Sequence, residues 1–65
     1  MEFKDKVVLA RAKLHLSQSK LAELLQVSLT TISRWETGKV SPTKKDELVF
    51  GEFCKENKIN LNEVE

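Results

Sequence analysis

The chain has 65 residues, of which 40% are hydrophobic and 32% are charged, and its net charge is +1. This length allows one domain, because it is too short to bury two hydrophobic cores. The composition excludes a disordered tail, and no apolar run approaches the roughly 18 residues of a membrane-spanning helix. No signal-peptide pattern opens the chain and its single cysteine excludes an internal disulfide, so a reducing cytoplasm is the expected location.

The small net charge conceals an uneven distribution. Residues 1–20 carry five basic and two acidic side chains, and residues 34–45 carry four basic and one acidic. Residues 46–65 carry two basic and six acidic side chains. Positive charge therefore flanks the middle of the chain, which favours a protein that meets phosphate on one face only.

The first predicted helix covers residues 3–14. Apolar side chains recur along it at helical spacing and form one stripe, made of Phe3, Val7, Ala10 or Arg11, and Leu14. Val8 and Ala12 widen this stripe. His15 follows at the helix end, where a histidine is most often a partner of the helix dipole. Leu16 is expected to enter the core just before the next helix.

The middle of the chain contains two short helices joined by a tight turn. Within each half the apolar residues fall three or four apart: Leu21, Ala22, Leu25, Val27, Ile32 and Trp35. Ser17 and Ser28 stand at N-cap positions, which predicts helices over residues 18–25 and 29–37. Gly38 is the expected stop of the second helix. Two short helices around a tight turn are the architecture of a DNA-binding helix-turn-helix.

A fourth helix is expected after Pro42, which bars a continuous helix across the preceding loop. Thr43 and Asp46 have the spacing of a capping box, and the helix should reach about residue 57. Its apolar residues are Leu48, Val49, Phe50, Phe53 and Cys54. The domain should span residues 1–58, with residues 59–65 as a tail or the start of a fifth helix.

Five motifs occur in order through the middle of the chain: LSQ, LA, VS, TISRWE and GK-x-x-P. With these motifs at these spacings, the sequence resembles the Cro/repressor (Xre-like) helix-turn-helix family over about residues 3–50. The resemblance implies an all-α fold, a compact bundle of four to five short helices of the lambda-repressor type. It also implies a sequence-specific DNA-binding transcription regulator of bacterial or phage type, with repression as the expected action.

The sequence departs from the family pattern at three positions. His15 and Gln26 stand where the family commonly has glycine, so both turns must be made without one. A non-glycine residue in the left-handed region costs on the order of 1 kcal/mol. Gly51 stands where the family usually has alanine at a close helix contact.

The outward face of the helix over residues 29–37 is expected to read bases. Its inner face is apolar, which leaves four outward side chains: Leu29, Thr30, Ser33 and Arg34. Arg34 can donate two hydrogen bonds to guanine O6 and N7, while Thr30 and Leu29 can meet a thymine methyl group.

Other residues are expected to contact the DNA backbone: Gln18, Ser28, Lys39, Thr43 and Lys44. Gln18 opens a helix, where free amides and the positive end of the dipole favour a phosphate. By resemblance, its side chain clamps the DNA backbone and can touch the outermost base. The resemblance also implies a structural salt bridge between Arg11 and Glu36.

Catalysis finds little support in the sequence. Cys54 and His15 are the one nucleophile and base that could pair, and no third group is placed to orient them. A metal site needs clustered ligands, and the chain has one cysteine and one histidine. We therefore expect no enzyme activity, no cofactor, no metal and no small-molecule ligand.

The expected partner is double-stranded DNA, with a pseudo-palindromic operator and a homodimer that reads it. Leu61 and Val64 could form a dimer contact. Two alternatives stay open. The chain could be a DNA-targeting module of a larger protein, or a protein-interaction adaptor, antitoxin-like or coactivator-like, that uses the same fold. An apolar surface in place of the polar one at residues 29–34 would have favoured the adaptor.

Overall fold

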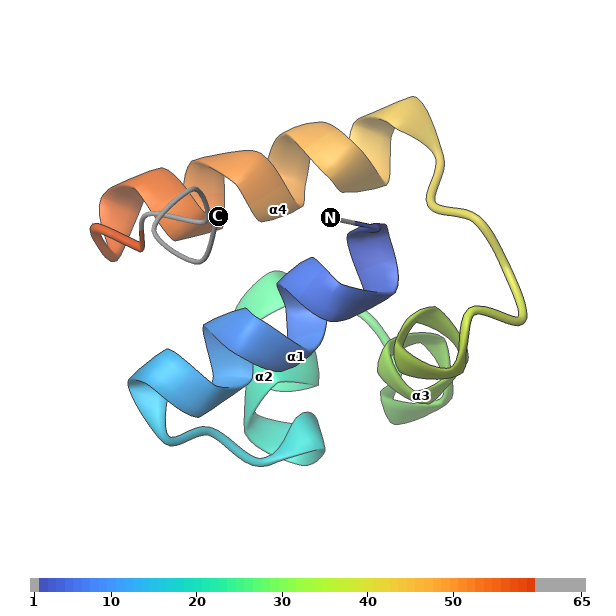
Figure 1. Cartoon of the computed structure of the whole chain (residues 1–65), viewed down its shortest axis with the longest axis horizontal. Helices are drawn as coiled ribbons and strands as arrows, with labels where there is room; N and C mark the ends of the chain where they lie inside the picture. The colour runs from blue at the N-terminus through green and yellow to red at the C-terminus, as the bar shows by residue number, and fades with distance from the viewer. Residues whose placement is uncertain (1, 60–65) are drawn as a thin grey trace.

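The structure, a computed structural model, describes residues 2–59, and four helices fill most of that range (Figure 1). They are α1 (Phe3–Leu14), α2 (Gln18–Leu25), α3 (Leu29–Thr37) and α4 (Lys44–Glu56). Residues 2–59 contain no strand, so the predicted all-α class is confirmed. The expected fifth helix and the possible dimer contact at Leu61 and Val64 lie outside the described residues.

Hydroxyl side chains begin three of the helices. The oxygens of Ser17, Ser28 and Thr43 each accept a hydrogen bond from the amide three residues ahead, at 3.0 or 3.1 Å. The carboxylate of Asp46 in turn accepts from the amide of Thr43 at 3.1 Å, which completes the predicted capping box. The caps fix where α2, α3 and α4 start.

A left-handed residue lies just beyond the end of every helix. His15, Gln26 and Gly38 come directly after α1, α2 and α3, with φ between 55° and 75°. After α4, Asn57 at φ −95° comes first and the left-handed Lys58 at φ 56° follows it. The amide of the next residue then donates to the carbonyl five residues back, which is the Schellman motif. Three of these next residues are apolar and pack against the core: Leu16, Val27 and Ile59.

The core takes buried side chains from all four helices: Val7, Ala10, Leu21, Ala22, Leu25, Ile32, Trp35, Phe50, Phe53 and Cys54. Phe3 at the start of α1 connects this helix with α3 and α4. Its ring meets those of Trp35 and Phe50 edge-on, at centroid distances of 5.1 and 5.3 Å. The expected widening of the α1 stripe is wrong, since Val8 is 44% exposed and Ala12 is also exposed.

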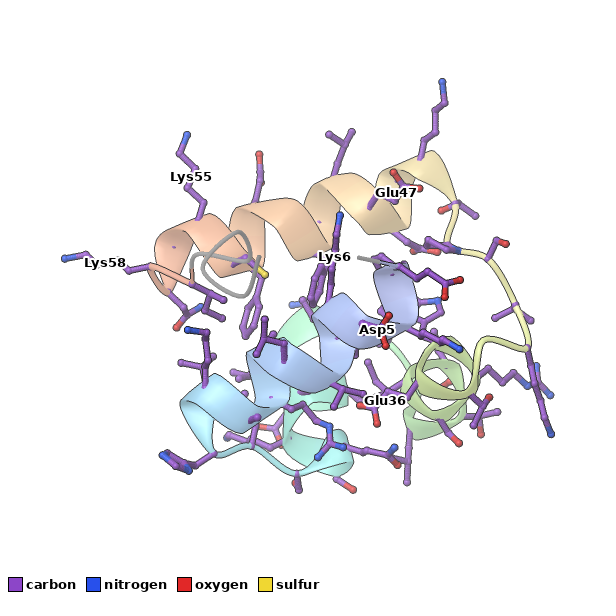
Figure 2. All side chains as sticks on the ribbon, in the orientation of Figure 1. Asp5, Lys6, Glu36, Glu47, Lys55 and Lys58 are labelled. Carbon is purple, nitrogen blue, oxygen red and sulfur yellow. The ribbon has the colours of Figure 1, made fainter. Side chains whose placement is uncertain are left out.

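Helix α3 packs against both α1 and α2, and α4 packs against α2. In the view of Figure 1, α4 runs above α1. Near its C-terminal end, Lys55 and Lys58 project away from the bundle (Figure 2). The expected close contact at Gly51 is wrong, because a Cβ atom placed there would meet no atom within 4 Å. The outer face of α4 is therefore exposed, including Leu48 at 70%.

Candidate nucleic-acid interface

Helix α3 presents two different faces. Ile32 and Trp35 are 0% and 3% exposed and fix the helix against the core. The remaining face leaves Leu29, Thr30 and Arg34 exposed, with Ser33 half-buried beside them. An exposed helix face with a guanidinium group, two hydroxyls and a single leucine has the chemistry that base edges in a major groove require.

An open hollow of about 430 Å³ lies beside this face. The side chains that line it come from the start of α2, from α3 and from the loop after α3: Gln18, Leu29, Thr30, Ser33, Arg34, Thr37 and Lys39. All four residues expected to read bases are in this set, together with two of those expected to contact the DNA backbone. The structure therefore brings residues 21 positions apart in sequence, Gln18 and Lys39, to one concave surface.

Thr37 also lines the hollow and is not among the residues expected at DNA. Its hydroxyl donates to the carbonyl of Arg34 at 3.2 Å, which ties the side chain to the last turn of α3. The signal was present in the sequence, because Thr37 follows Ser33 by four positions and Thr30 by seven, on the same helix face.

The start of α2 supplies free donors beside the hollow. The Ser17 oxygen accepts from the amide of Lys20 at 3.0 Å, so one of the unpaired amides of the first turn is satisfied. The amides of Gln18 and Ser19 have no hydrogen-bond partner among residues 2–59. Such amides, at the positive end of the helix dipole, favour an anion.

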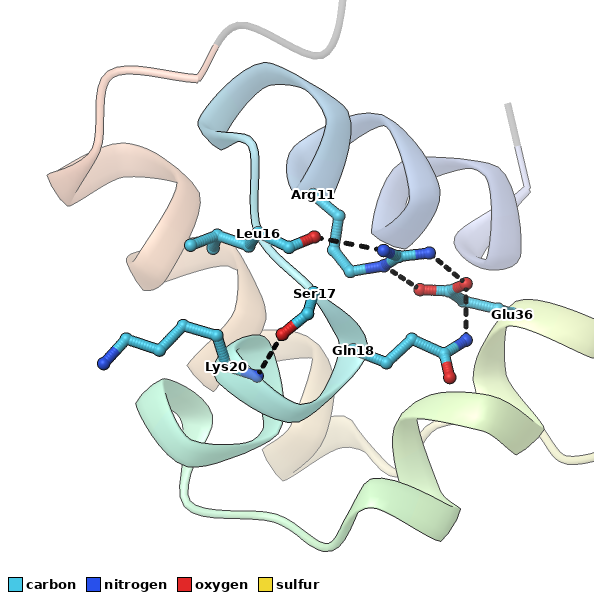
Figure 3. A network of polar contacts seen from close by, with 6 residues as sticks. All are labelled: Arg11, Leu16, Ser17, Gln18, Lys20 and Glu36. Carbon is cyan, nitrogen blue, oxygen red and sulfur yellow. Dashed lines mark hydrogen bonds and ion pairs between the residues drawn. The ribbon is translucent and has the colours of Figure 1, made fainter.

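Arg11, Glu36 and Gln18 form one network that connects α1, α3 and α2 (Figure 3). Arg11 donates to the Glu36 carboxylate with Nε at 2.6 Å and Nη2 at 2.9 Å, a two-point contact. Its Nη1 donates to the carbonyl of Leu16 at 3.1 Å. Gln18 Nε2 donates to the Oε1 atom of Glu36 at 3.0 Å.

The network is partly withdrawn from water, with the side chains of Arg11 and Glu36 24% and 9% exposed. The hydrogen bond from Arg11 lowers the pKa of Glu36 below its ordinary value, burial opposes this effect, and the bond from Gln18 reinforces it. The same pair raises the pKa of Arg11. Both groups are therefore charged at neutral pH.

Three expected backbone contacts lie outside the hollow: Ser28, Thr43 and Lys44. The Ser28 and Thr43 oxygens serve as helix caps, and Ser28 also shares a hydrogen bond of 2.9 Å with the Thr31 hydroxyl. Lys44 is exposed at the start of α4.

Cys54 and His15 are poorly placed for catalysis. Cys54 is 4% exposed, and burial raises the pKa of its thiol, with a smaller opposing effect from Lys6. His15 is exposed at the end of α1. Within residues 2–59 no three histidine, cysteine or acidic side chains gather where they could hold a metal ion. In the same range, no helix has the length and apolar character to span a membrane.

Comparison with known proteins agrees with this geometry. A helix-turn-helix family matches residues 9–46, which contain α2 and α3 entirely. The chain therefore belongs to the Cro/repressor (Xre-like) helix-turn-helix family of DNA-binding transcription regulators.

Among curated proteins, the chain is similar to the HTH-type transcriptional activator BcrR of Enterococcus faecalis. The two are 37% identical over an alignment 82 positions long, gaps included, which covers 98% of this chain. The chain spans about 40% of the length of that relative. No solved structure gives a significant match.

Proposed function

We propose that the chain is a sequence-specific module for double-stranded DNA that places α3 in the major groove. The observation that carries this proposal is the hollow beside α3, which six of the nine residues expected at DNA share. A concave surface whose lining side chains are polar except for Leu29, with free amides at its rim, suits a duplex better than it suits a protein partner. The adaptor alternative loses support for the same reason.

In this proposal the residues of α3 read base edges. Arg34 donates two hydrogen bonds to a guanine, and Thr30 and Leu29 meet a thymine methyl group. The Ser33 hydroxyl can form a hydrogen bond with the edge of either base. Family members often carry glutamines at these positions, so the preferred sequence is expected to be this chain's own.

Phosphate contacts are proposed to position the module without reading sequence. The free amides of Gln18 and Ser19 donate hydrogen bonds to a phosphate at the start of α2. Lys39 and Lys44 supply positive charge from the loop and from the start of α4. The hydroxyls of Ser28 and Thr43, although they accept in caps, can donate their own protons to phosphate oxygens.

The direction of regulation has two candidates. Repression is the action expected from the family resemblance, and a module that only occupies DNA achieves it by blocking a promoter. Activation is favoured by the name of the relative, a transcriptional activator. A promoter reporter with the bound site placed over or upstream of the promoter separates the two.

We also propose that residues 1–58 act as the DNA-targeting domain, at the nucleoid in the cytoplasm. Two copies are proposed to read a pseudo-palindrome. Selection of bound sites from random DNA tests the function. The proposal predicts enrichment of one sequence, with half-sites about one helical turn apart if a dimer binds. Recovery of DNA with no enriched sequence would contradict the proposed function and would favour a protein-interaction adaptor instead.

A further inference from the structure

We propose that the Arg11–Glu36 pair orients Gln18 so that its side-chain carbonyl oxygen faces DNA and selects a base with an exocyclic amino group. This inference rests on the proposed function and assigns Gln18 a role in specificity. The resemblance implies a backbone clamp and contact with the outermost base; the inference goes beyond these by naming the base chemistry and the groups that orient Gln18. Glu36 is then a positioning residue that touches no DNA itself.

The orientation of the Gln18 amide follows from the chemistry of its partner. An ionised carboxylate accepts hydrogen bonds and cannot donate them. The Oε1 atom of Glu36 accepts from Gln18 Nε2 at 3.0 Å and from Arg11 Nη2 at 2.9 Å. If the Gln18 amide were rotated by half a turn, its oxygen would face the carboxylate oxygen, so the rotated form is disfavoured.

Arg11 makes this orientation rigid. Its three donor atoms are engaged with the two carboxylate oxygens of Glu36 and the carbonyl of Leu16. Glu36 is 9% exposed at its side chain, so water competes weakly for its oxygens. The carboxylate is therefore held in place before any DNA arrives.

The remaining face of Gln18 points to the proposed groove. In Figure 3 the carbonyl oxygen of Gln18 is directed away from Glu36. The same side chain lines the hollow with Thr30, Ser33 and Arg34. Gln18 thus offers an acceptor and one free N–H group beside the side chains proposed to read bases.

A phosphate has no proton to give to the Gln18 oxygen, whereas two bases have one. Adenine presents its N6 amino group in the major groove, and cytosine presents its N4 amino group. The shared chemistry is an exocyclic amine. Phosphate contact at this helix start falls to donors, which are the main-chain amides of Gln18 and Ser19 and the free side-chain N–H group of Gln18.

Modified bases test the inference most directly. In the selected duplex, each adenine is replaced in turn by purine, which lacks the N6 amine, and each cytosine by 2-pyrimidinone, which lacks the N4 amine. Wild type is expected to lose affinity about threefold to tenfold at a position that Gln18 reads, the value of one hydrogen bond. The base at which the loss occurs identifies adenine or cytosine.

Gln18→Met should abolish the loss at that position and keep the losses at positions read by α3. Glu36→Gln should reduce selectivity at the same position, because its amide can also donate and so permits both orientations of Gln18. Glu23→Gln is the matched control. It makes the same chemical change on α2 at a side chain that is 71% exposed and pairs with Lys20, and it should leave selectivity unchanged.

Two outcomes would overturn the inference. One is that Gln18→Met weakens every duplex by the same factor and flattens the salt dependence, which identifies a phosphate contact. The other is that Gln18→Met leaves the response to modified bases as in wild type. Should Glu36→Gln fail to fold, the Gln18→Met measurements still decide between these outcomes.

A measurement without DNA separates this inference from the proposed function. In nuclear magnetic resonance spectra of the free protein, the side-chain amide protons of Gln18 should exchange with water more slowly than those of the exposed Gln26. Equal exchange would overturn the proposed orientation. Slow exchange in a protein that binds no duplex would leave the orientation intact and remove the DNA-binding proposal.

Discussion

At the scale of single residues, Glu36 connects three helices through one carboxylate. It accepts from Arg11 on α1 and from Gln18 at the start of α2, while its own backbone belongs to α3. We expect Glu36→Gln to lower the free energy of unfolding by roughly 1–3 kcal/mol, because Arg11 loses its charged partner in a partly buried position. Urea denaturation measures the change. A loss within about 0.5 kcal/mol, the usual range for a surface substitution, would show that the pair adds no stability.

The stability that this pair supplies should depend on pH. The pKa of Glu36 is lowered in the folded protein, so its contribution is complete above the ordinary glutamate pKa. It is then lost as the pH falls through the lowered pKa of the folded state. The difference in unfolding free energy between wild type and Glu36→Gln should therefore narrow on acidification below the ordinary glutamate range. A constant difference down to strongly acid pH would contradict the assignment.

Gln26 is a local weakness in the turn between α2 and α3. Its φ of 60° lies in the left-handed region, which glycine adopts without steric cost. Gln26→Gly should raise the free energy of unfolding by several tenths of a kcal/mol to about 1 kcal/mol, after allowance for the greater entropy of unfolded glycine. Thermal melting measures this gain in stability. His15→Gly should give a gain of the same kind, because His15 has φ 55°. An unchanged or lower melting temperature would mean that the side chain of Gln26 contributes more than the strain costs.

At the scale of elements, the residues that cap and end the helices could be predicted from the sequence. The width of the exposed face of each helix could be predicted less well. The Schellman motif needs a left-handed residue, and an apolar residue commonly follows it; His15–Leu16 and Gln26–Val27 supply both. The α1 stripe was drawn too wide because periodicity alone cannot tell how much of a small helix its neighbours cover. Val8 satisfies the pattern and still remains 44% exposed.

Helix α4 carries an avoidable cost at Gly51. Family resemblance suggested a close helix contact there, but open space surrounds the position where a Cβ atom would lie. Gly51→Ala should therefore stabilise the protein by about 0.5–1 kcal/mol, because alanine loses less entropy than glycine in a helix interior. Chemical denaturation measures the gain. A destabilised Gly51→Ala protein would indicate a contact at this face that the isolated chain does not make.

At the scale of the whole molecule, the fold could be predicted and the composition of the site only partly. Helix order, caps and core follow from periodicity and capping residues, which are local. The hollow depends on how α2 and the loop after α3 meet α3, which periodicity does not contain. For this reason Thr37 was missed, and the sequence did not show that Thr43 and Lys44 are outside the lining of the hollow. The bond from Gln18 to Glu36 was missed because nothing local pairs them.

In the proposed complex, the exposed face of α3 reads bases while the loop after α3 contacts phosphates. The test measures affinity for the selected duplex and for a scrambled duplex across a salt series. The proteins compared are wild type, Arg34→Ala and Lys39→Ala. Arg34→Ala should lose selectivity by the roughly 1–3 kcal/mol of a two-point base contact. Lys39→Ala should weaken both duplexes about equally and reduce the salt slope by about one unit. A parallel loss for both duplexes in Arg34→Ala would contradict the claim and make Arg34 a phosphate contact.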